Sequence, residues 1–159
     1  MKELEINPFT KFDKQWALLT SGDKEKFNSM TISWGSMGTL WHKPVVTVYV
    51  KPSRYTYEFL KENDYFTISF YGNEYKKMLG MMGSVSGRNI DKIKEAKLTP
   101  KYLERGITFE EAKETIICRK MYMEQMDKEK FPKEVLRFYE NRNETEAHYL
   151  IIGEVENIE

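Results

Sequence analysis

The chain has 159 residues, of which 40% are hydrophobic and 31% charged, and its 25 basic side chains equal its 25 acidic ones. This balance excludes the basic surface typical of nucleic-acid binding, and the length fits one domain spanning residues 1–159. The single cysteine excludes an intramolecular disulfide and an all-cysteine zinc site. Because no segment is apolar enough to span a membrane and the N-terminus lacks the apolar region of a signal peptide, we expect a cytoplasmic protein.

The first half of the chain has the pattern of β-strands. Apolar runs and period-two alternation predict strands at 15–20, 27–34, 45–50 and 65–70. We interpret GSMG, residues 35–38, as a break between strands, and Pro44 as the residue that opens the next one. Residues 54–63 are predicted to form a short helix with Ser53 as its N-cap.

The second half alternates short helices with two longer strands. Helices are predicted at 73–83, 91–98 and 131–139, and strands at 114–126 and 147–158. Thr108 and Glu111 have the spacing of a capping box. About six strands with short helices between them, rather than one helix per strand, favour a mainly β fold: a small barrel decorated by helices, not a doubly wound parallel sheet.

The segment PSRYTYEF, residues 52–59, carries a candidate anion site. Ser53, Arg54 and Thr56 lie at the predicted helix start, where free backbone N–H groups and the helix dipole favour an anion. The guanidinium would add charge-assisted hydrogen bonds, so a phosphate monoester would fit. A capped surface helix with one solvated arginine explains the same residues, and the pattern leaves both interpretations open.

Residues 28–41 form a candidate site for a planar ligand. Thr31 and Ser33 could hydrogen-bond the edge of such a ligand. The side chains that would pack against its faces are Met30, Trp34 and Met37. A half-buried strand whose tryptophan and methionines fill the core is the alternative.

The segment GSVSGRNIDKI, residues 83–93, is a flexible loop rich in hydrogen-bond donors. Its candidate ligand-binding residues are Gly83, Ser84, Ser86, Gly87, Arg88 and Lys92. It matches neither a phosphate-binding loop of nucleotide hydrolases nor the dinucleotide motif GxGxxG. An ordinary mobile loop explains the segment equally well.

Other catalytic constellations find little support. The two histidines, His42 and His148, with one cysteine leave too few ligands for a transition metal, so no metal site is predicted. Cys118 lies within an apolar strand, so an inert buried thiol is preferred to a Cys118–His148 nucleophilic pair. No GxSxG elbow is present. His148 precedes the last strand and could face a ligand, although a surface position is the commoner one. We assign no catalytic residue, with His148 as a weak candidate.

Five segments together carry a resemblance to a known family. They are NSMTISWGSMGTLW (28–41), KPVVTVYVKPSRYTYEF (43–59), GSVSGRNIDKI (83–93), EEAKETIICRKMY (110–122) and AHYLIIGEV (147–155). In order and spacing they resemble the flavin reductase-like family of FMN-binding split barrels, in particular its flavoredoxin-type branch. The chain departs from the family at Glu146-Ala147, which replaces an acidic-aromatic pair before the histidine.

The resemblance implies a homodimer of split β-barrels with one FMN bound per subunit near the dimer interface. It places FMN against a strand and turn, a phosphate site, a serine-glycine loop and a histidine. These residues are Asn28, Ser29, Met30, Thr31, Ser33, Trp34 and Met37, then Ser53, Arg54 and Thr56, then Ser84, Ser86, Gly87, Arg88 and Lys92, and His148.

The function that the resemblance implies is an NAD(P)H-dependent oxidoreductase. It would pass electrons through FMN to a free flavin, a ferric complex or another small acceptor. The flavin itself supplies the redox chemistry, so no side chain has to act as acid or base. The alternative is an FMN electron carrier that is reduced by a protein donor and has no nicotinamide site of its own.

Overall fold

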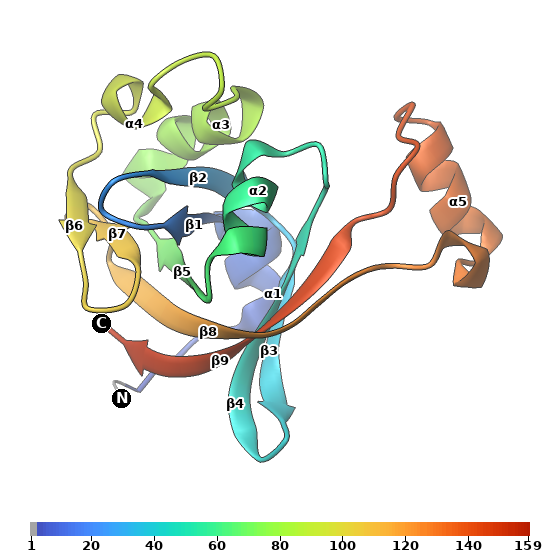
Figure 1. The fold of residues 1–159 in the computed structure, drawn as a ribbon, viewed down its shortest axis with the longest axis horizontal. Helices are drawn as coiled ribbons and strands as arrows, with labels where there is room; N and C mark the ends of the chain where they lie inside the picture. The colour runs from blue at the N-terminus through green and yellow to red at the C-terminus, as the bar shows by residue number, and fades with distance from the viewer. Residues whose placement is uncertain (1–2) are drawn as a thin grey trace.

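The computed structural model describes residues 3–159, which form a strongly curved antiparallel sheet with short helices around it (Figure 1). Within these residues the strands are β1 (Ala17–Gly22), β2 (Phe27–Ile32), β3 (Gly35–Leu40), β4 (Lys43–Val50), β5 (Tyr65–Phe70), β6 (Pro100–Tyr102), β7 (Ile107–Phe109), β8 (Glu114–Gln125) and β9 (Tyr149–Ile158). The main sheet has the order β2-β1-β5-β8-β9-β4-β3, and β6 pairs with β7 in a separate hairpin. The prediction of a mainly β fold with short helices is confirmed.

The two edge strands of the main sheet are neighbours in the sequence. β2 and β3 lie at opposite ends of the strand order, yet only Ser33 and Trp34 separate them. The sheet therefore has to curl until its edges approach one another. Its concave side encloses a core to which β1, β2, β4, β5, β8 and β9 all contribute, with Leu19, Ile68 and Ile151 fully buried. The place where the two edges meet is called the seam below.

The helices are short and lie outside the barrel. They are α1 (Pro8–Thr10), a π-helical turn η1 (Lys11–Gln15), α2 (Tyr55–Glu62), η2 (Asn73–Tyr75), α3 (Lys76–Ser84), α4 (Lys92–Glu95), η3 (Lys128–Lys130) and α5 (Lys133–Glu140). Helix α2 packs on β1 and β2, and α3 packs on β2. Helix α5 lies to one side of the barrel, at the end of the extension between β8 and β9 (Figure 1). Residues 126–148 of this extension are called the arm.

The interpretation of GSMG as a break was wrong, because these residues belong to strand β3. A Cβ on Gly35 would lie 2.7 Å from the Phe12 ring, so this glycine allows close packing rather than a turn. The hairpin turn falls instead at Trp41 and His42, whose φ angles of 53° and 56° are those of a tight primed turn. A tryptophan-histidine pair carries none of the sequence signals of such a turn.

Other boundaries also differ from the predictions. The first strand begins at Ala17 rather than residue 15, because a π-helical turn ends at Gln15. The short hairpin of β6 and β7 was not predicted. Thr108 lies in β7 and bonds the hydroxyls of Ser69 and Thr115, so the capping box was wrong. The predicted helix at 91–98 is only the four residues of α4.

Candidate functional site

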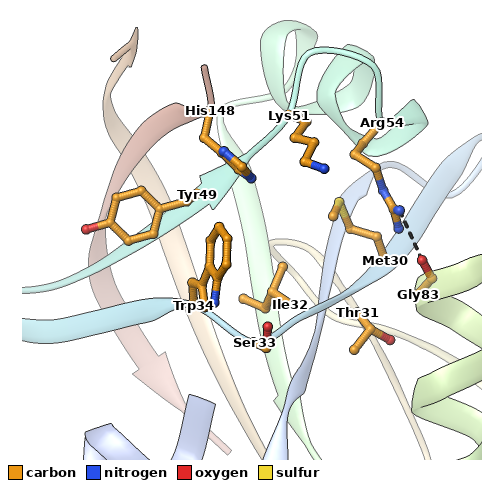
Figure 2. Close-up of a pocket in the computed structure, with 10 residues that line it drawn as sticks. All are labelled: Met30, Thr31, Ile32, Ser33, Trp34, Tyr49, Lys51, Arg54, Gly83 and His148. Carbon is orange, nitrogen blue, oxygen red and sulfur yellow. Dashed lines mark hydrogen bonds between the residues drawn. The ribbon is translucent and has the colours of Figure 1, made fainter. Parts of the chain in front are cut away.

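One group of predicted site residues surrounds a cavity of about 230 Å³ at the seam (Figure 2). It is called the seam pocket and is lined by Met30, Thr31, Ile32, Ser33, Trp34, Tyr49, Lys51, Arg54, Gly83 and His148. Residues from β2 and its link to β3 form one side. The end of β4, the start of α2 and the residue before β9 supply the side that carries polar and charged groups.

A second cavity of about 180 Å³ lies at the start of helix α2. This helix-start pocket is lined by Asn28, Met30, Ser53, Arg54, Tyr55, Thr56, Ser84, Val85, Ser86, Gly87 and Lys92. Met30 and Arg54 line both cavities, so the two adjoin. The arrangement offers a polar compartment beside one that is part aromatic.

Helix α2 begins one residue later than predicted. Its N-cap is Arg54, with φ −75° and ψ 136°, and no side chain caps the first turn, so the assignment of Ser53 as N-cap was wrong. The first amide groups of the helix therefore keep no side-chain acceptor. Free N–H groups at the positive end of a helix dipole favour an anion at this end of the pocket.

Two cations line the helix-start pocket, and neither has a carboxylate partner within residues 3–159. Arg54 donates from Nη1 to the carbonyl of Gly83 at 3.0 Å. The buried ammonium of Lys92 donates to the carbonyls of Met82 at 3.2 Å and Val85 at 3.4 Å. Burial, reinforced by the charge of Arg54, lowers the pKa of Lys92 to about 8, and burial also lowers the pKa of Arg54. Two adjacent cations in this state favour a bound anion.

The loop after helix α3 closes tightly over this pocket. A Cβ on Gly87 would lie 2.2 Å from Oδ1 of Asn28, so only glycine fits. The same Asn28 donates from Nδ2 to the buried hydroxyl of Thr56 at 2.8 Å. Strand β2, helix α2 and the loop are thus joined around one polar compartment.

The hydroxyl groups of Thr31 and Ser33 in the seam pocket differ in how free they are to hydrogen-bond a ligand. Thr31 donates to the carbonyl of Leu79 at 2.5 Å, so its hydrogen is committed to helix α3 and only its lone pairs remain for a ligand. Ser33 lines the pocket beside it, and Trp34 stands across the cavity from Arg54 (Figure 2). The predicted ring-edge contact therefore falls chiefly to Ser33.

Lys51 is a cation of the seam pocket that sequence reasoning missed. It follows strand β4 and forms an ion pair with Glu144 of the arm. The second carboxylate oxygen of Glu144 is buried without a hydrogen-bond partner. Lys51 precedes Pro52-Ser53, and a lysine beside the predicted phosphate segment was the only available signal.

His148 is buried, which corrects the expectation of a surface position. Its Nδ1 lies 2.6 Å from Oη of Tyr139, and its backbone N–H donates to the same oxygen at 3.3 Å. Burial, with the nearby charge of Lys51, lowers the pKa of His148 to about 4, so the imidazole is neutral at pH 7. The ring also packs 5.2 Å from that of Trp34.

Three predicted residues lie outside both cavities. Ser29 is buried and bonds Thr20 at 2.7 Å between hydroxyl oxygens. Met37 packs against the main core. Arg88 pairs with Glu58 and donates to the carbonyl of Ser53, so it lies beside the helix-start pocket rather than in its wall. The wall residues that were not among the predicted candidates are Ile32, Tyr49, Lys51, Tyr55 and Val85.

The remaining candidates carry no site. Cys118 is fully buried in the main core, and burial raises the pKa of its thiol far above the ordinary value. Within residues 3–159, no group of three or more His, Cys, Asp or Glu side chains is arranged to hold a metal ion. None of the helices in the described part of the chain has the length and apolar character that a bilayer crossing requires.

Comparisons with known proteins agree with this architecture. A family model described as "Flavin reductase like domain" matches residues 9–159. Comparison with the sequences of curated proteins gives no match. Among solved structures, the flavoredoxin of Methanosarcina acetivorans is 24% identical, with a TM-score of 0.69 over 100% of this chain and 75% of that one.

Two further structures extend the likeness. The flavoredoxin of Desulfovibrio vulgaris (Miyazaki F) is 22% identical, with a TM-score of 0.69 over 91% of this chain and 68% of that one. An FMN-binding protein of Thermus thermophilus, solved with bound 1-cyclohex-2-enone, is 19% identical, with a TM-score of 0.71 over 100% of this chain and 80% of that one. At such identities the likeness establishes the fold, and the predicted split β-barrel is confirmed.

Proposed function

The chain belongs to the flavin reductase-like family, and from this premise we propose that it binds FMN and acts as an oxidoreductase, with NAD(P)H as electron donor and a small molecule as acceptor. The observation that carries the proposal is the pair of cations, Arg54 and Lys92, which have no carboxylate partner in the described part of the chain and line a pocket that adjoins a part-aromatic one. A phosphate monoester joined to a planar ring matches that sequence of compartments.

The residues divide between the two ends of such a ligand. The phosphate would lie in the helix-start pocket, against Arg54, Lys92 and the first amides of α2. The ring would lie in the seam pocket, with Trp34 at one wall and Ser33 at its edge. Bound FMN supplies the electron transfer, and the protein supplies position and electrostatics.

Lys51 and His148 would act on the ring's electrostatics. A cation beside the ring stabilises added negative charge, so Lys51 would favour the reduced flavin. Its ion pair with Glu144 moderates that effect. The neutral imidazole of His148 would border the ring without adding charge.

The deciding experiment is an absorbance spectrum of the purified protein, repeated anaerobically after NADH and then NADPH. We expect the visible bands of oxidised flavin, bleached by at least one nicotinamide. FMN should be retained and riboflavin released, because only FMN has the phosphate. A colourless protein that takes up no added FMN would overturn the proposal.

A second candidate is an FMN electron carrier that is reduced by a protein donor. One observation favours it. Arg54 is assigned to the phosphate and Lys51 already pairs with Glu144, so no further cation among residues 3–159 lines the seam pocket to bind a dinucleotide pyrophosphate. Reduction by dithionite but by neither nicotinamide would select this candidate.

The protein is further proposed to be a homodimer that pairs near the seam. The support is a group of exposed apolar side chains on or beside edge strand β3, namely Trp34 at 42%, Leu40 at 37% and Trp41 at 53% exposure. Exposed apolar groups on an edge strand favour association. Sedimentation equilibrium of the wild type and of Trp41→Glu tests this, and a wild type that is monomeric at all concentrations would refute it.

A further inference from the structure

A third cavity, of about 350 Å³, lies between the arm and the rim of the sheet. This arm pocket is lined by Trp34, Tyr49, Met126, Phe131, Val135, Phe138, Tyr139 and His148. Trp34, Tyr49 and His148 line the seam pocket as well, so the arm pocket adjoins the proposed flavin-ring site. The proposed FMN site places no part of the cofactor in the arm pocket.

The walls of the arm pocket are aromatic and mutually packed. The ring of Trp34 lies 5.4 Å from that of Phe138, and Phe131 stacks on Tyr139 at 5.7 Å with 9° between the ring planes. The first contact holds the arm against the residues that link β2 to β3, and the second lies within the arm. Flat walls of this kind favour a flat ligand, because stacking adds to the burial of apolar area.

The pocket carries one directed polar group. The hydroxyl oxygen of Tyr139 accepts from the backbone N–H of His148 and also contacts Nδ1 of that imidazole. Because this hydroxyl has no other acceptor within residues 3–159, we take it as the donor to Nδ1. The neutral ring then carries its own hydrogen on Nε2. No hydrogen bond to Nε2 is formed within residues 3–159, and His148 lies at the border of the arm and seam pockets.

The lack of charged side chains in the pocket walls selects against ionic ligands. The arm pocket is lined by no lysine, arginine, aspartate or glutamate. An ion entering it would lose hydration, and the cations that pack on its aromatic walls, Arg142 on Phe138 and Lys128 on Tyr139, are not among the residues that line it. An uncharged ligand with one acceptor oxygen meets no such penalty.

We propose that the arm pocket binds an uncharged, flat, aromatic or conjugated carbonyl compound whose oxygen accepts from Nε2 of His148. The inference deepens the proposed function by naming the class of small molecule that binds beside the flavin ring, and it rests on that function. The ligand would lie beside the flavin ring, within the arm and not in the phosphate compartment.

The test measures binding by calorimetry, on the protein as purified and again after saturation with FMN. The probe is 2-acetylnaphthalene, with 2-naphthoate as its charged counterpart and 2-ethylnaphthalene as the analogue without an acceptor. We expect the ketone to bind about tenfold or more tightly than either. Equal binding of the carboxylate would overturn the assignment of ligand class, and equal binding of the hydrocarbon would overturn the role of His148.

Variants locate the site. Val135→Trp fills the arm pocket and should weaken ketone binding about tenfold or more, while Arg137→Trp, at an exposed position on the same helix, should leave it unchanged. Nuclear Overhauser contacts between the ketone and the Trp34 indole in the wild type keep the test decisive if Val135→Trp misfolds. Absence of these contacts would refute the site.

The experiments also distinguish a failure of the proposed function from a failure of this inference. Failure of the proposed function appears as absence of bound flavin, which leaves ketone binding to the FMN-free protein measurable. If no ketone binds and Val135→Trp converts a dimer into a monomer, the pocket is filled by a second copy of the chain and the inference is wrong.

Discussion

The guanidinium of Arg54 and the ammonium of Lys92 line one cavity, and each binds only backbone carbonyl oxygens. Those carbonyls belong to the end of helix α3 and the loop after it, where a helix dipole favours positive charge. The partial negative charge at one helix end compensates one of these cations more readily than both. Neither side chain forms an ion pair within residues 3–159. One positive charge therefore stays uncompensated, and this is the main reason for placing a phosphate here.

Arg54→Met should weaken FMN binding by about 1.5–3 kcal/mol, the usual size of a charged hydrogen bond, and leave riboflavin binding nearly unchanged. The measurement is a pair of fluorescence titrations, one with each flavin. Lys77→Met on helix α3, exposed and away from both cavities, is the control and should change neither. Equal losses for the two flavins would move Arg54 out of the phosphate site.

The affinity for FMN should fall as the pH rises above about 8. The pKa of Lys92 is lowered to about 8 in the folded protein, so deprotonation there removes one of the two cations facing the phosphate. Bound phosphate favours the ammonium and raises its pKa in the complex, so the decline begins near pH 8 and ends at that higher pKa. The FMN dissociation constant against pH, for wild type and Lys92→Met, tests this. The same loss of FMN affinity with rising pH in Lys92→Met would contradict the assignment of Lys92 to the phosphate.

The sequence predicted those strands whose pattern is local. The β-branched run of β4 and the alternation in β5 were recognised because each strand's own residues determine its burial. Strand β3 was missed because the reason for Gly35 is the ring of Phe12, which is distant in the sequence. Tertiary contacts of this kind leave no periodic signal.

The same distinction applies to the site. Arg54 and the loop near Gly87 were found because a helix start and a glycine-rich loop are local features. Lys51 and the burial of His148 depend on how the arm folds back, through Glu144 and Tyr139. No spacing within the chain encodes that return, so the arm pocket could be found only in the structure.

Glu144→Gln should raise the reduction potential of bound FMN by about 30 mV, equivalent to roughly 1.4 kcal/mol for a two-electron couple. The substitution removes the partner of Lys51 and leaves its full charge beside the ring. Lys51→Met should shift the potential in the opposite direction. Potentiometric titration of both variants measures the shifts, and shifts of the same sign would exclude an electrostatic role for this pair.

Gly87→Ala should weaken FMN binding about tenfold, or roughly 1.4 kcal/mol. The new Cβ would meet Oδ1 of Asn28 and disturb the bond from Asn28 to Thr56 inside the helix-start pocket. Gly80→Ala is the matched control, since its Cβ would meet nothing within 4 Å and alanine favours the helix by about 1 kcal/mol. Thermal unfolding separates a binding defect from a folding defect, and unchanged FMN affinity in a folded Gly87→Ala protein would contradict the close packing.

His148 should make the protein less stable as the pH falls from about 6.5 to about 4. Its folded-state pKa of about 4 lies below the ordinary value of 6.5, so the unfolded chain binds a proton in that range and the folded one does not. The difference in unfolding free energy between wild type and His148→Gln should therefore be constant above pH 6.5. It should shrink by on the order of 3 kcal/mol as the pH approaches 4. Denaturant titrations at several pH values measure it, and NMR titration of the two histidines, assigned with His42→Gln, gives the pKa directly. A pH-independent difference, or titration of His148 near 6.5, would mean that the imidazole is not buried neutral against Tyr139, and the hydrogen on Nε2 would lose its basis.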